Sequence, residues 1–328
     1  MGGEGGISIT LPAAAQALQE NSELQLYLVG NESQMAAFLP LFSESSRLRL
    51  EIINTEGVVS DGDKPANVLR NGKDTSMYKA VELVKDGSAQ AMVSAGNTGA
   101  LLMIGRHLLK TIPGIQKPAI VATIPGATRQ CYLLDVGANP ECDGKQLFEF
   151  AVMGSVLAES LLDDEVRVGL LNIGSEYYKG TDEVQEAAVL LTRCAAINYV
   201  GFIEANALFK GIADVVVCDG FVGNVTIKSS AGVADVVKSL LKAQIERSWL
   251  SRTMALFSSS ILSRLNQQID PHRFNGASLL GLQGSIVKSH GNASIEGFAC
   301  AIKQAVSEIE NAVPQLIAEK VAAIMATN

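Results

Sequence analysis

The sequence predicts an α/β protein with a largely parallel sheet. Short apolar runs without clean alternation recur along the chain, and amphipathic helical patterns separate them. Such runs are typical of strands that are buried on both faces of a parallel sheet. Polar and glycine residues gather directly after four of these runs, at residues 94–99, 135–139, 172–180 and 219–224. In open α/β sheets ligands bind at the carboxyl ends of the strands, so these loops indicate a ligand site.

The composition is that of a globular protein. The chain has 328 residues, of which 48% are hydrophobic and 18% are charged, with 30 glycines, so disorder and coiled coil are both poor fits. A formal net charge of -8 argues against a nucleic-acid partner, because nucleic-acid binders normally carry a basic surface. An acidic partner would therefore have to meet a local basic patch.

The sequence argues against several common kinds of site. The five cysteines are odd in number and form no Cys-x-x-Cys, and only three histidines are present, so we expect neither a disulfide framework nor a metal site. The Gly-x-Gly-x-x-Gly and Gly-x-x-x-x-Gly-Lys patterns are missing, which argues against a dinucleotide or nucleoside triphosphate. No basic residue precedes the mildly apolar start and no apolar run approaches the ~20 residues of a spanning helix, so we expect a cytoplasmic protein.

The order of elements follows from these patterns. In the first part of the chain, Pro12 is predicted to start a helix at 13–18, and strands follow at 24–29 and 47–53. A polar connection then leads to a helix that opens with Pro65, a residue suited to a first helical turn. Further along we expect helix 77–85, a strand and turn in 89–100, paired strands 115–122 and 131–136, helix 144–162, strand 165–173, helix 182–195, strands 199–203 and 215–218, a helix after 224, a glycine-rich stretch 275–284, strand 285–288 and a final helix in 295–326.

The stretch 89–100 has the arrangement of an anion site. An apolar run leads into a small, glycine-bearing turn, and a helical pattern starts straight after it. This geometry presents free backbone N–H groups and the positive end of the helix dipole to an anion. An ordinary turn between a strand and a helix would look the same, but the recurrence of similar loops favours binding. The candidate phosphate-binding residues are Ser94, Gly96, Asn97, Thr98 and Gly99.

Residues 236–268 form a predicted helical segment of unusual composition. No acidic residue lies between Glu246 and Asp270, and apolar side chains recur on one helical face. This pattern fits a buried helix pair or subunit interface, and it equally fits an interfacial helix that contacts a membrane or an acidic partner. For the second interpretation, the contact residues are Arg247, Trp249, Arg252, Phe257, Ile261 and Arg264.

Taken together, the loops resemble the PlsX family, the fatty-acyl phosphate acyltransferases of bacterial phospholipid synthesis. The matches keep one order over most of the chain, which makes them specific as a set. They are Met1-Gly2-Gly3, residues 12–14, Ser76-Met77, residues 94–100, 135–139 and 172–174, Lys179-Gly180, and residues 201–204, 219–224, 279–281 and 288–291.

This resemblance implies a reaction, a fold and partners. The reaction is conversion of an acyl carrier protein thioester plus inorganic phosphate to acyl phosphate and free carrier protein, without a metal or cofactor. The implied fold is a three-layer α/β/α sandwich over residues 1–328, similar to isocitrate and isopropylmalate dehydrogenases and to phosphotransacetylases, with 236–268 protruding. The implied setting is a cytoplasmic homodimer on the membrane periphery, with the downstream glycerol-3-phosphate acyltransferase among its partners.

The resemblance also assigns roles within the loops. Lys179 and Asn224 match residues implicated in catalysis, where Lys179 would neutralise phosphate or the oxyanion and Asn224 would donate to the oxyanion. His290 is a candidate proton donor to the leaving thiolate, although a histidine satisfied within a turn is the alternative. The scattered cysteines are not needed as nucleophiles. Further candidates, which would orient substrates or simply shape the loops, are Asp135, Asn139, Asn172, Gly174 and Glu176.

Three departures from the family pattern stand out. Glu4 replaces the usual aspartate after Met-Gly-Gly, and the basic run before Ser76 is thinned to residues 70–73. The strand that normally precedes Met-Gly-Gly is missing. We therefore expect that the native product starts upstream of Met1 or that the chain as written is markedly destabilised.

Two other functions are weighed against this one. The first is a coenzyme A-dependent transferase similar to phosphotransacetylase, which product analysis with both acyl donors would separate. The second is a non-catalytic lipid- or protein-binding module on the same fold. The presence of Lys179 and Asn224 argues against that module.

Overall fold

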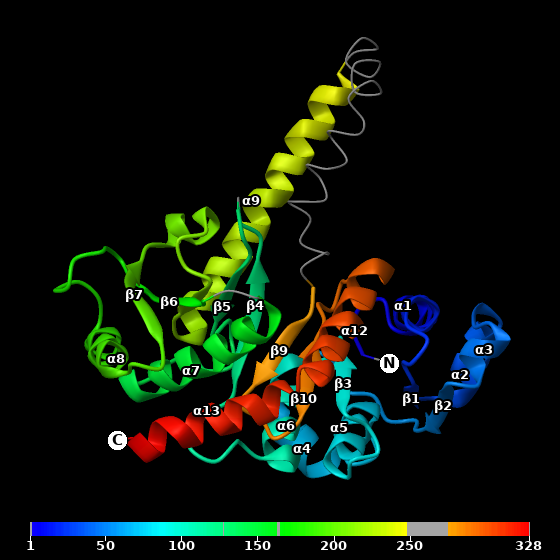
Figure 1. Cartoon of the computed structure of the whole chain (residues 1–328). Coiled ribbons are helices and arrows are strands. Elements are labelled where there is room, and N and C mark those ends of the chain that lie inside the picture. Colours follow the sequence, from blue (N-terminus) through cyan, green and yellow to red (C-terminus); the bar gives the residue numbers. More distant parts are fainter. Residues whose placement is uncertain (1, 127, 163–164, 248–274, 328) are drawn as a thin grey trace.

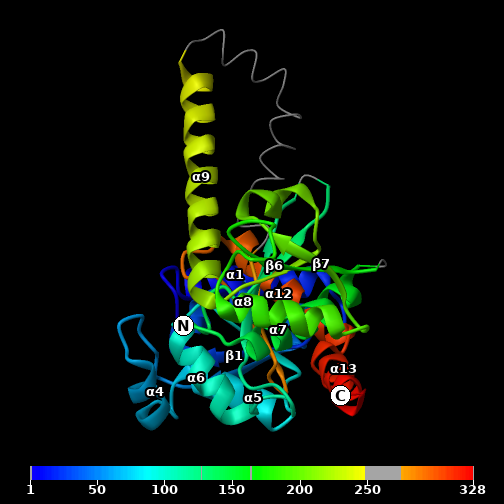
Figure 2. The same cartoon turned by 90° about the vertical axis from the view of Figure 1, so that its left-hand side faces the viewer.

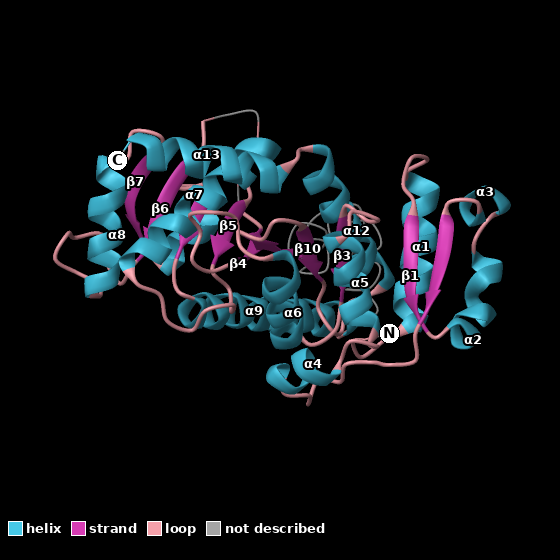
Figure 3. Cartoon of the chain, turned by 90° about the horizontal axis from the view of Figure 1, so that it is seen from below, coloured by secondary structure: helices cyan, strands magenta, loops and turns pink. Residues whose placement is uncertain are grey.

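The computed structural model describes residues 2–126, 128–162, 165–247 and 275–327. An eight-stranded sheet lies between two layers of helices (Figure 1, Figure 3). Helices α7 (Gly144–Leu161) and α13 (Val313–Thr327) pack on one face around Phe150, which is fully buried. Helices α5 (Ser76–Lys85) and α6 (Thr98–Leu109) cover the other face. The predicted three-layer α/β architecture is confirmed.

The sheet contains two parallel groups that run in opposite directions. Four of its seven neighbouring pairs are parallel, and the three antiparallel pairs lie together in the middle. Because three reversals are an odd number, the chain direction of the first group is opposite to that of the last. In order across the sheet the strands are β3 (Ala91–Ser94), β10 (Ser285–Lys288), β9 (Ala277–Leu280), β4 (Ala119–Ile124), β5 (Cys131–Leu134), β8 (Val215–Val217), β6 (Arg167–Leu171) and β7 (Asn198–Ile203).

This reversal sorts the candidate loops into two sets. Loops 135–139, 172–180 and 219–224 follow β5, β6 and β8, which are parallel neighbours, so they leave the sheet at one edge. Loop 94–99 follows β3, whose parallel neighbour is β10. From the sequence we expected all four loops to lie at one edge of a parallel sheet. Because the two groups of strands run in opposite directions, strand direction does not bring loop 94–99 together with the other three.

The remaining elements complete the layers and connect the strands. Helix α4 opens with Pro65 in its first turn, as predicted. These elements are α1 (Ile7–Glu20), β1 (Leu26–Gly30), α2 (Glu32–Met35), η1 (Ala36–Leu41), α3 (Glu44–Arg47), β2 (Leu50–Asn54), α4 (Pro65–Asn71), α8 (Asp182–Arg193), η2 (Ala205–Lys210), α9 (Gly220–Glu246) and α12 (Ile295–Glu310).

Four details differ from the prediction, the first being that residues 220–224, predicted as a loop before the helix, form the first turns of α9 because Asp219 caps the helix. Helix α1 begins at Ile7 and contains Pro12, because burial of its alanine and leucine face against α12 outweighs the hydrogen bond that proline lacks. Strand β9 lies within the stretch that we described only as glycine-rich. The final helix is two helices, since Ala312 takes a positive φ of 50° between α12 and α13.

Helix α9 extends away from the body of the protein (Figure 1, Figure 2). Its 27 residues begin beside the sheet, and Val233, Val236 and Leu240 on its outer part are exposed. Arg247 directly follows it, whereas the predicted contact residues Trp249, Arg252, Phe257, Ile261 and Arg264 lie outside the described residues. In the described part of the chain, every helix is too short or too polar to cross a bilayer.

Strands β1 and β2 form a separate two-stranded parallel sheet beside β3 (Figure 3). A groove of about 600 Å³ lies between β1 and β3. Half-buried apolar side chains from both strands, among them Leu28 and Val93, line it together with side chains of α1, α5 and α12. The facing edges of β1 and β3 pair with no other strand among the described residues. This groove therefore has the walls that an additional strand needs.

We predict that an apolar extension at the N-terminus stabilises the fold. About five β-branched residues would match a typical strand, and each buried side chain contributes roughly 1.5–3 kcal/mol. Melting temperatures of the chain with and without the extension test this. Val93→Asp should abolish the gain, because it places a charge in the groove. Equal melting temperatures would show that the groove accepts no strand.

A buried carboxyl group joins α12 to the sheet. Glu308 is 2% exposed, and its carboxyl accepts hydrogen bonds from Ser278 of β9 and from Gln304 one turn earlier. Burial raises the pKa of Glu308 to about 7. The group is therefore neutral in the folded protein at a pH where it ionises in the unfolded chain.

We predict that this carboxyl makes stability fall as the pH rises. Between its unfolded pKa of about 4.5 and its folded pKa of about 7, the unfolded chain releases the proton first, at a cost of roughly 1.4 kcal/mol per pH unit. Glu308→Gln should remove this loss, so its gain in melting temperature over the native chain should grow from about pH 5 to pH 7. Glu310→Gln, on an exposed position of the same helix, is the matched control. A gain independent of pH would contradict the assignment.

Candidate active site

The loop after β3 is held by Asn97. Its side-chain oxygen accepts a hydrogen bond from the N–H of Ala100 and so caps α6. Its amide nitrogen donates to the carbonyl oxygens of Ser60, Asp61 and Asp63 at 3.0–3.2 Å. Both ends of the Asn97 amide are thus engaged within the protein. Asn97 shapes the loop, and the donors that face solvent come from other residues.

Gly96 is placed by close packing. It is buried, and a side-chain carbon added there would lie 2.9 Å from the terminal methyl group of Met77, on α5. Its N–H donates to the Ser94 hydroxyl oxygen at 3.2 Å. A larger residue would have to displace the end of the Met77 side chain, so the loop lies directly on α5.

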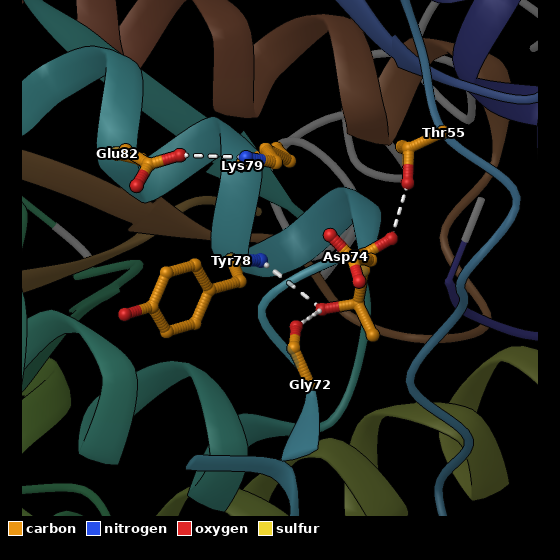
Figure 4. Close-up of polar contacts among 7 residues, drawn as sticks. Thr55, Gly72, Asp74, Tyr78, Lys79 and Glu82 are labelled. Carbon is orange, nitrogen blue, oxygen red and sulfur yellow. Dashed lines mark hydrogen bonds and ion pairs between the residues drawn. The ribbon is translucent and has the colours of Figure 1, made fainter. Parts of the chain in front are cut away.

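The start of α5 is itself fixed by a small polar network (Figure 4). Thr75 caps the helix, since its hydroxyl accepts from the N–H of Tyr78 and donates to the carbonyl of Gly72 at 2.6 Å. Thr55, which follows β2, donates to the carbonyl of Asp74. These contacts fix the start of α5, the helix that carries Met77 and against which Gly96 packs.

The exposed donors of this loop are at the start of α6. Thr98 and Gly99 are both exposed and occupy its first turn. Their N–H groups have no hydrogen-bond partner in the part of the chain that the structure describes. A helix N-terminus with free N–H groups stabilises anions through these donors and the helix dipole. This is the part of the predicted phosphate loop that suits an anion.

The loop after β10 lies against the same turn. Lys288 and Ser94 are register partners in the parallel pair, and the N–H of Ser289 donates to the Ser94 carbonyl at 2.8 Å. The N–H of His290 donates to the side-chain oxygen of Asn275 at 2.9 Å. The structure thus brings His290 into the neighbourhood of the predicted phosphate loop, as a chemical role in the same site requires.

Lys288 is a residue to which the sequence analysis assigned no role, although it begins the matched segment 288–291. It ends a buried strand, and its half-buried ammonium group donates to the carbonyl of Ala95 at 3.3 Å and to the carbonyl of Ser289. Burial lowers the pKa of Lys288 to about 8, against a smaller opposing effect of the Asp61 charge. A lysine at the end of an otherwise apolar strand is the signal that could have revealed it.

The loop after β5 is organised by Asp135. This fully buried carboxylate accepts hydrogen bonds from the N–H groups of Ile120, Gly137, Ala138 and Asn139, and from the Asn139 side chain. Burial raises the pKa of Asp135, and these hydrogen bonds act in the opposite direction. Asp135 and Asn139 are therefore engaged in shaping the loop, the alternative that the sequence left open.

Asn224 lies where α9 meets that loop. Its amide nitrogen donates to the carbonyl of Val136 at 3.1 Å, which uses one of its two N–H groups. Gly137 has a φ of 138°, and a side-chain carbon there would lie 2.7 Å from the Asn224 amide nitrogen. The glycine allows this close approach and leaves Asn224 half-buried at the strand edge.

Lys179 lies in the loop after β6 on the same edge. Its ammonium group forms an ion pair with Glu176 at 2.7 Å, and this pair lowers the pKa of Glu176. Asn172 closes the loop by donating to the Lys179 carbonyl at 3.0 Å. At Gly174 a side-chain carbon would lie 2.8 Å from the Lys179 amine, so glycine leaves room for that side chain.

The thiols and metal-binding side chains offer little reactivity. Burial raises the pKa of Cys131 and of Cys142 to about 12, and that of Cys218 well above its ordinary value. These thiols stay protonated at neutral pH. They are therefore poor nucleophiles, because the thiolate is the reactive form. Within the described ranges, no cluster of three or more His, Cys, Asp or Glu side chains is placed to hold a metal ion.

The candidate site residues therefore fall into two groups. The first, which we call the β3–β10 group, contains loop 94–99 with Lys288 and His290. The second, the β5–β6–β8 group, contains Asn224 at the start of α9, which follows β8, and Lys179 in the loop after β6.

Comparison with known proteins gives the chain its relatives. Residues 1–316 match the family model described as fatty acid synthesis protein. Proteins named phosphate acyltransferase are 46% identical in Shewanella woodyi and 47% identical in Shewanella sediminis, each over 99% of this chain and 96% of the relative. A protein of the same name from Methylococcus capsulatus is 46% identical over the same shares.

Solved structures share the fold at lower identity. A phosphotransacetylase from Streptococcus pyogenes is 18% identical with a TM-score of 0.62, covering 94% of this chain and 92% of its own. The EutD phosphotransacetylase from Staphylococcus aureus is 20% identical with a TM-score of 0.57, over 97% and 92%. A 4-hydroxythreonine-4-phosphate dehydrogenase from Klebsiella pneumoniae is 12% identical with a TM-score of 0.50, over 91% and 97%. On the near full-length sequence matches, the chain belongs to the fatty acid synthesis protein family, as its PlsX-like motifs indicated.

Proposed function

We propose that this enzyme transfers an acyl group from an acyl carrier protein thioester to inorganic phosphate, forming acyl phosphate and free carrier protein. The observation that carries this proposal is the near full-length match to proteins named phosphate acyltransferase. The name supports an acyltransferase with phosphate as acceptor. Acyl carrier protein as the donor is the finer part of the proposal.

The reaction places three demands on the site. A phosphate oxygen attacks the thioester carbonyl, a C–O bond forms, the C–S bond breaks, and the thiolate leaves with a proton. The enzyme must hold the phosphate dianion, place the thioester next to it, and stabilise the developing oxyanion. No covalent enzyme intermediate is needed, which agrees with the protonated state of the buried thiols.

We assign these demands to the two groups of residues, and their convergence on one pair of substrates is part of the proposal. The N–H groups of Thr98 and Gly99 bind phosphate at the start of α6, and His290 gives a proton to the leaving thiolate. Asn224 donates its second N–H to the oxyanion. Lys179 supplies positive charge to phosphate or to the oxyanion, while Glu176 holds the ammonium group in place.

Removing either donor should slow turnover while the fold persists. Loss of one preorganised donor typically costs about 10²–10³ in rate. We therefore expect Lys179→Ala and Asn224→Ala each to lower kcat within that range, measured as acyl phosphate trapped with hydroxylamine. Lys79→Ala is the matched control, because Lys79 forms a similar ion pair with Glu82 at 3.0 Å on another element. A variant with near-native turnover at saturating phosphate would remove that residue from the mechanism.

Coenzyme A is the competing acyl carrier. The likeness to phosphotransacetylases shows the fold alone, so it does not choose between the donors. The same trapping assay with acyl carrier protein and coenzyme A thioesters of one acyl chain decides between them. A higher kcat/KM for the coenzyme A thioester would favour the alternative function.

Membrane contact and a homodimer are also part of the proposal. The exposed apolar side chains Val233, Val236 and Leu240 on the outer part of α9 are the described residues that support such a contact. Arg247 adds a positive charge at the end of the helix. In the membrane form of the proposal, the segment after α9 lies against an anionic lipid surface.

Flotation with anionic liposomes tests the membrane contact. Each basic residue near an anionic surface contributes about 1 kcal/mol, and salt screens this contribution. We expect the floating fraction to fall with added salt and with Phe257→Glu. Leu48→Glu is the control, because Leu48 is 90% exposed and lies next to α3, far from the segment after α9 in the sequence. Flotation unchanged by both treatments would leave a buried helix pair or a subunit interface as the role of the segment.

A further inference from the structure

We propose that Lys288 is a positioning residue for phosphate, which sets the phosphate-binding turn by fixing the carbonyl of Ala95. This inference rests on the proposed function and adds a residue to it. Lys288 belongs to the β3–β10 group, in which the turn after β3 and the loop after β10 leave two neighbouring parallel strands.

The first argument is the contact itself. The Lys288 ammonium group donates to the carbonyls of Ala95 and Ser289, one in each of the two loops. It therefore ties the two loops together at the point where both leave the sheet. Ala95 directly precedes Gly96, which is buried against Met77 of α5, so the tie acts on a closely packed turn.

The second argument is the direction of dipoles. A carbonyl oxygen that faced the bound dianion would repel it, whereas N–H groups attract it. With the Ala95 carbonyl held by Lys288, the free N–H groups of Thr98 and Gly99 remain the polar groups that the turn presents to solvent. The lysine thus favours the loop conformation that binds an anion.

The third argument is charge. Asp61 and Asp63 lie beside the turn through their carbonyl contacts with Asn97, and Asp61 acts on the Lys288 charge. The backbone of Glu4 lies beside the loop after β10, because its N–H donates to the Gly291 carbonyl at 2.8 Å. The Asp61 carboxylate opposes an anion at this turn. The hydrogen bonds of Lys288 go to neutral carbonyls, so its positive charge offsets that of Asp61.

Steady-state kinetics in phosphate provide the test. Lys288→Gln should raise the KM for phosphate about tenfold or more and change kcat less, since the residue acts on binding of phosphate. Lys288→Arg keeps the charge and the donors, so it should recover most of the affinity. Lys303→Met is the control, because Lys303 is exposed on α12 and pairs with Glu20 at 2.6 Å.

The pH profile gives a second readout. The titratable groups on the neighbouring segments are Asp61, Asp63, Glu4 and His290, of which Asp61 acts on the Lys288 charge, and burial lowers the pKa of Lys288 to about 8. The KM for phosphate should therefore rise above about pH 8 in the native enzyme and stay flatter in Lys288→Arg. A merely structural lysine would move the melting temperature without this difference.

A binding measurement separates this proposal from the proposed function. The rise in melting temperature with added inorganic phosphate should be clear in the native chain and smaller in Lys288→Gln. Acyl phosphate formation with an unchanged KM in Lys288→Gln would overturn the role of Lys288 alone. A phosphate shift that depends on Lys288 without any acyl phosphate would overturn the proposed function alone.

Discussion

The buried carboxylate of Asp135 is the constraint on which this site depends. Five N–H donors converge on it, from β4, from the loop after β5 and from Asn139. A buried charge is tolerated only when its hydrogen bonds are satisfied, so the chain around it has one conformation. The start of α9 packs on this loop, because the N–H of Gly220 donates to the Asn139 carbonyl at 2.7 Å. Asn224 is in turn held in place by the hydrogen bond that its amide donates to the backbone carbonyl of Val136.

The division of the sheet into two parallel groups gives the enzyme two separate sets of loops. In the proposed reaction, acyl transfer to phosphate joins two reactants of different chemistry, a dianion and a thioester. The β3–β10 group offers free N–H groups and a lysine, which suit the dianion. The β5–β6–β8 group offers an amide and a lysine paired with Glu176, which suit a carbonyl that becomes charged.

Electrostatics explain why the positive groups are held so closely. The chain carries a net charge of -8, so a phosphate dianion approaches against the overall charge. Lys179 and Lys288 are each fixed by contacts within their loops, and α6 adds the positive end of its dipole. Donors that are already fixed lose little conformational entropy when the ligand binds, so preorganisation lowers the free-energy cost of binding.

The sequence by itself determined the α/β class, most strand and helix positions, and the segments that carry the candidate site residues. These depend on local patterns, such as apolar runs, glycine turns and the placement of Pro65. Strand direction was beyond its reach, because the antiparallel centre of the sheet depends on pairing between residues far apart, such as Val121 with Leu134 and with Ser278. The same holds for Lys288 and for the engagement of Asn97 and Asp135. A side chain's partners are decided by which loops the sheet brings together, and only the tertiary structure decides that.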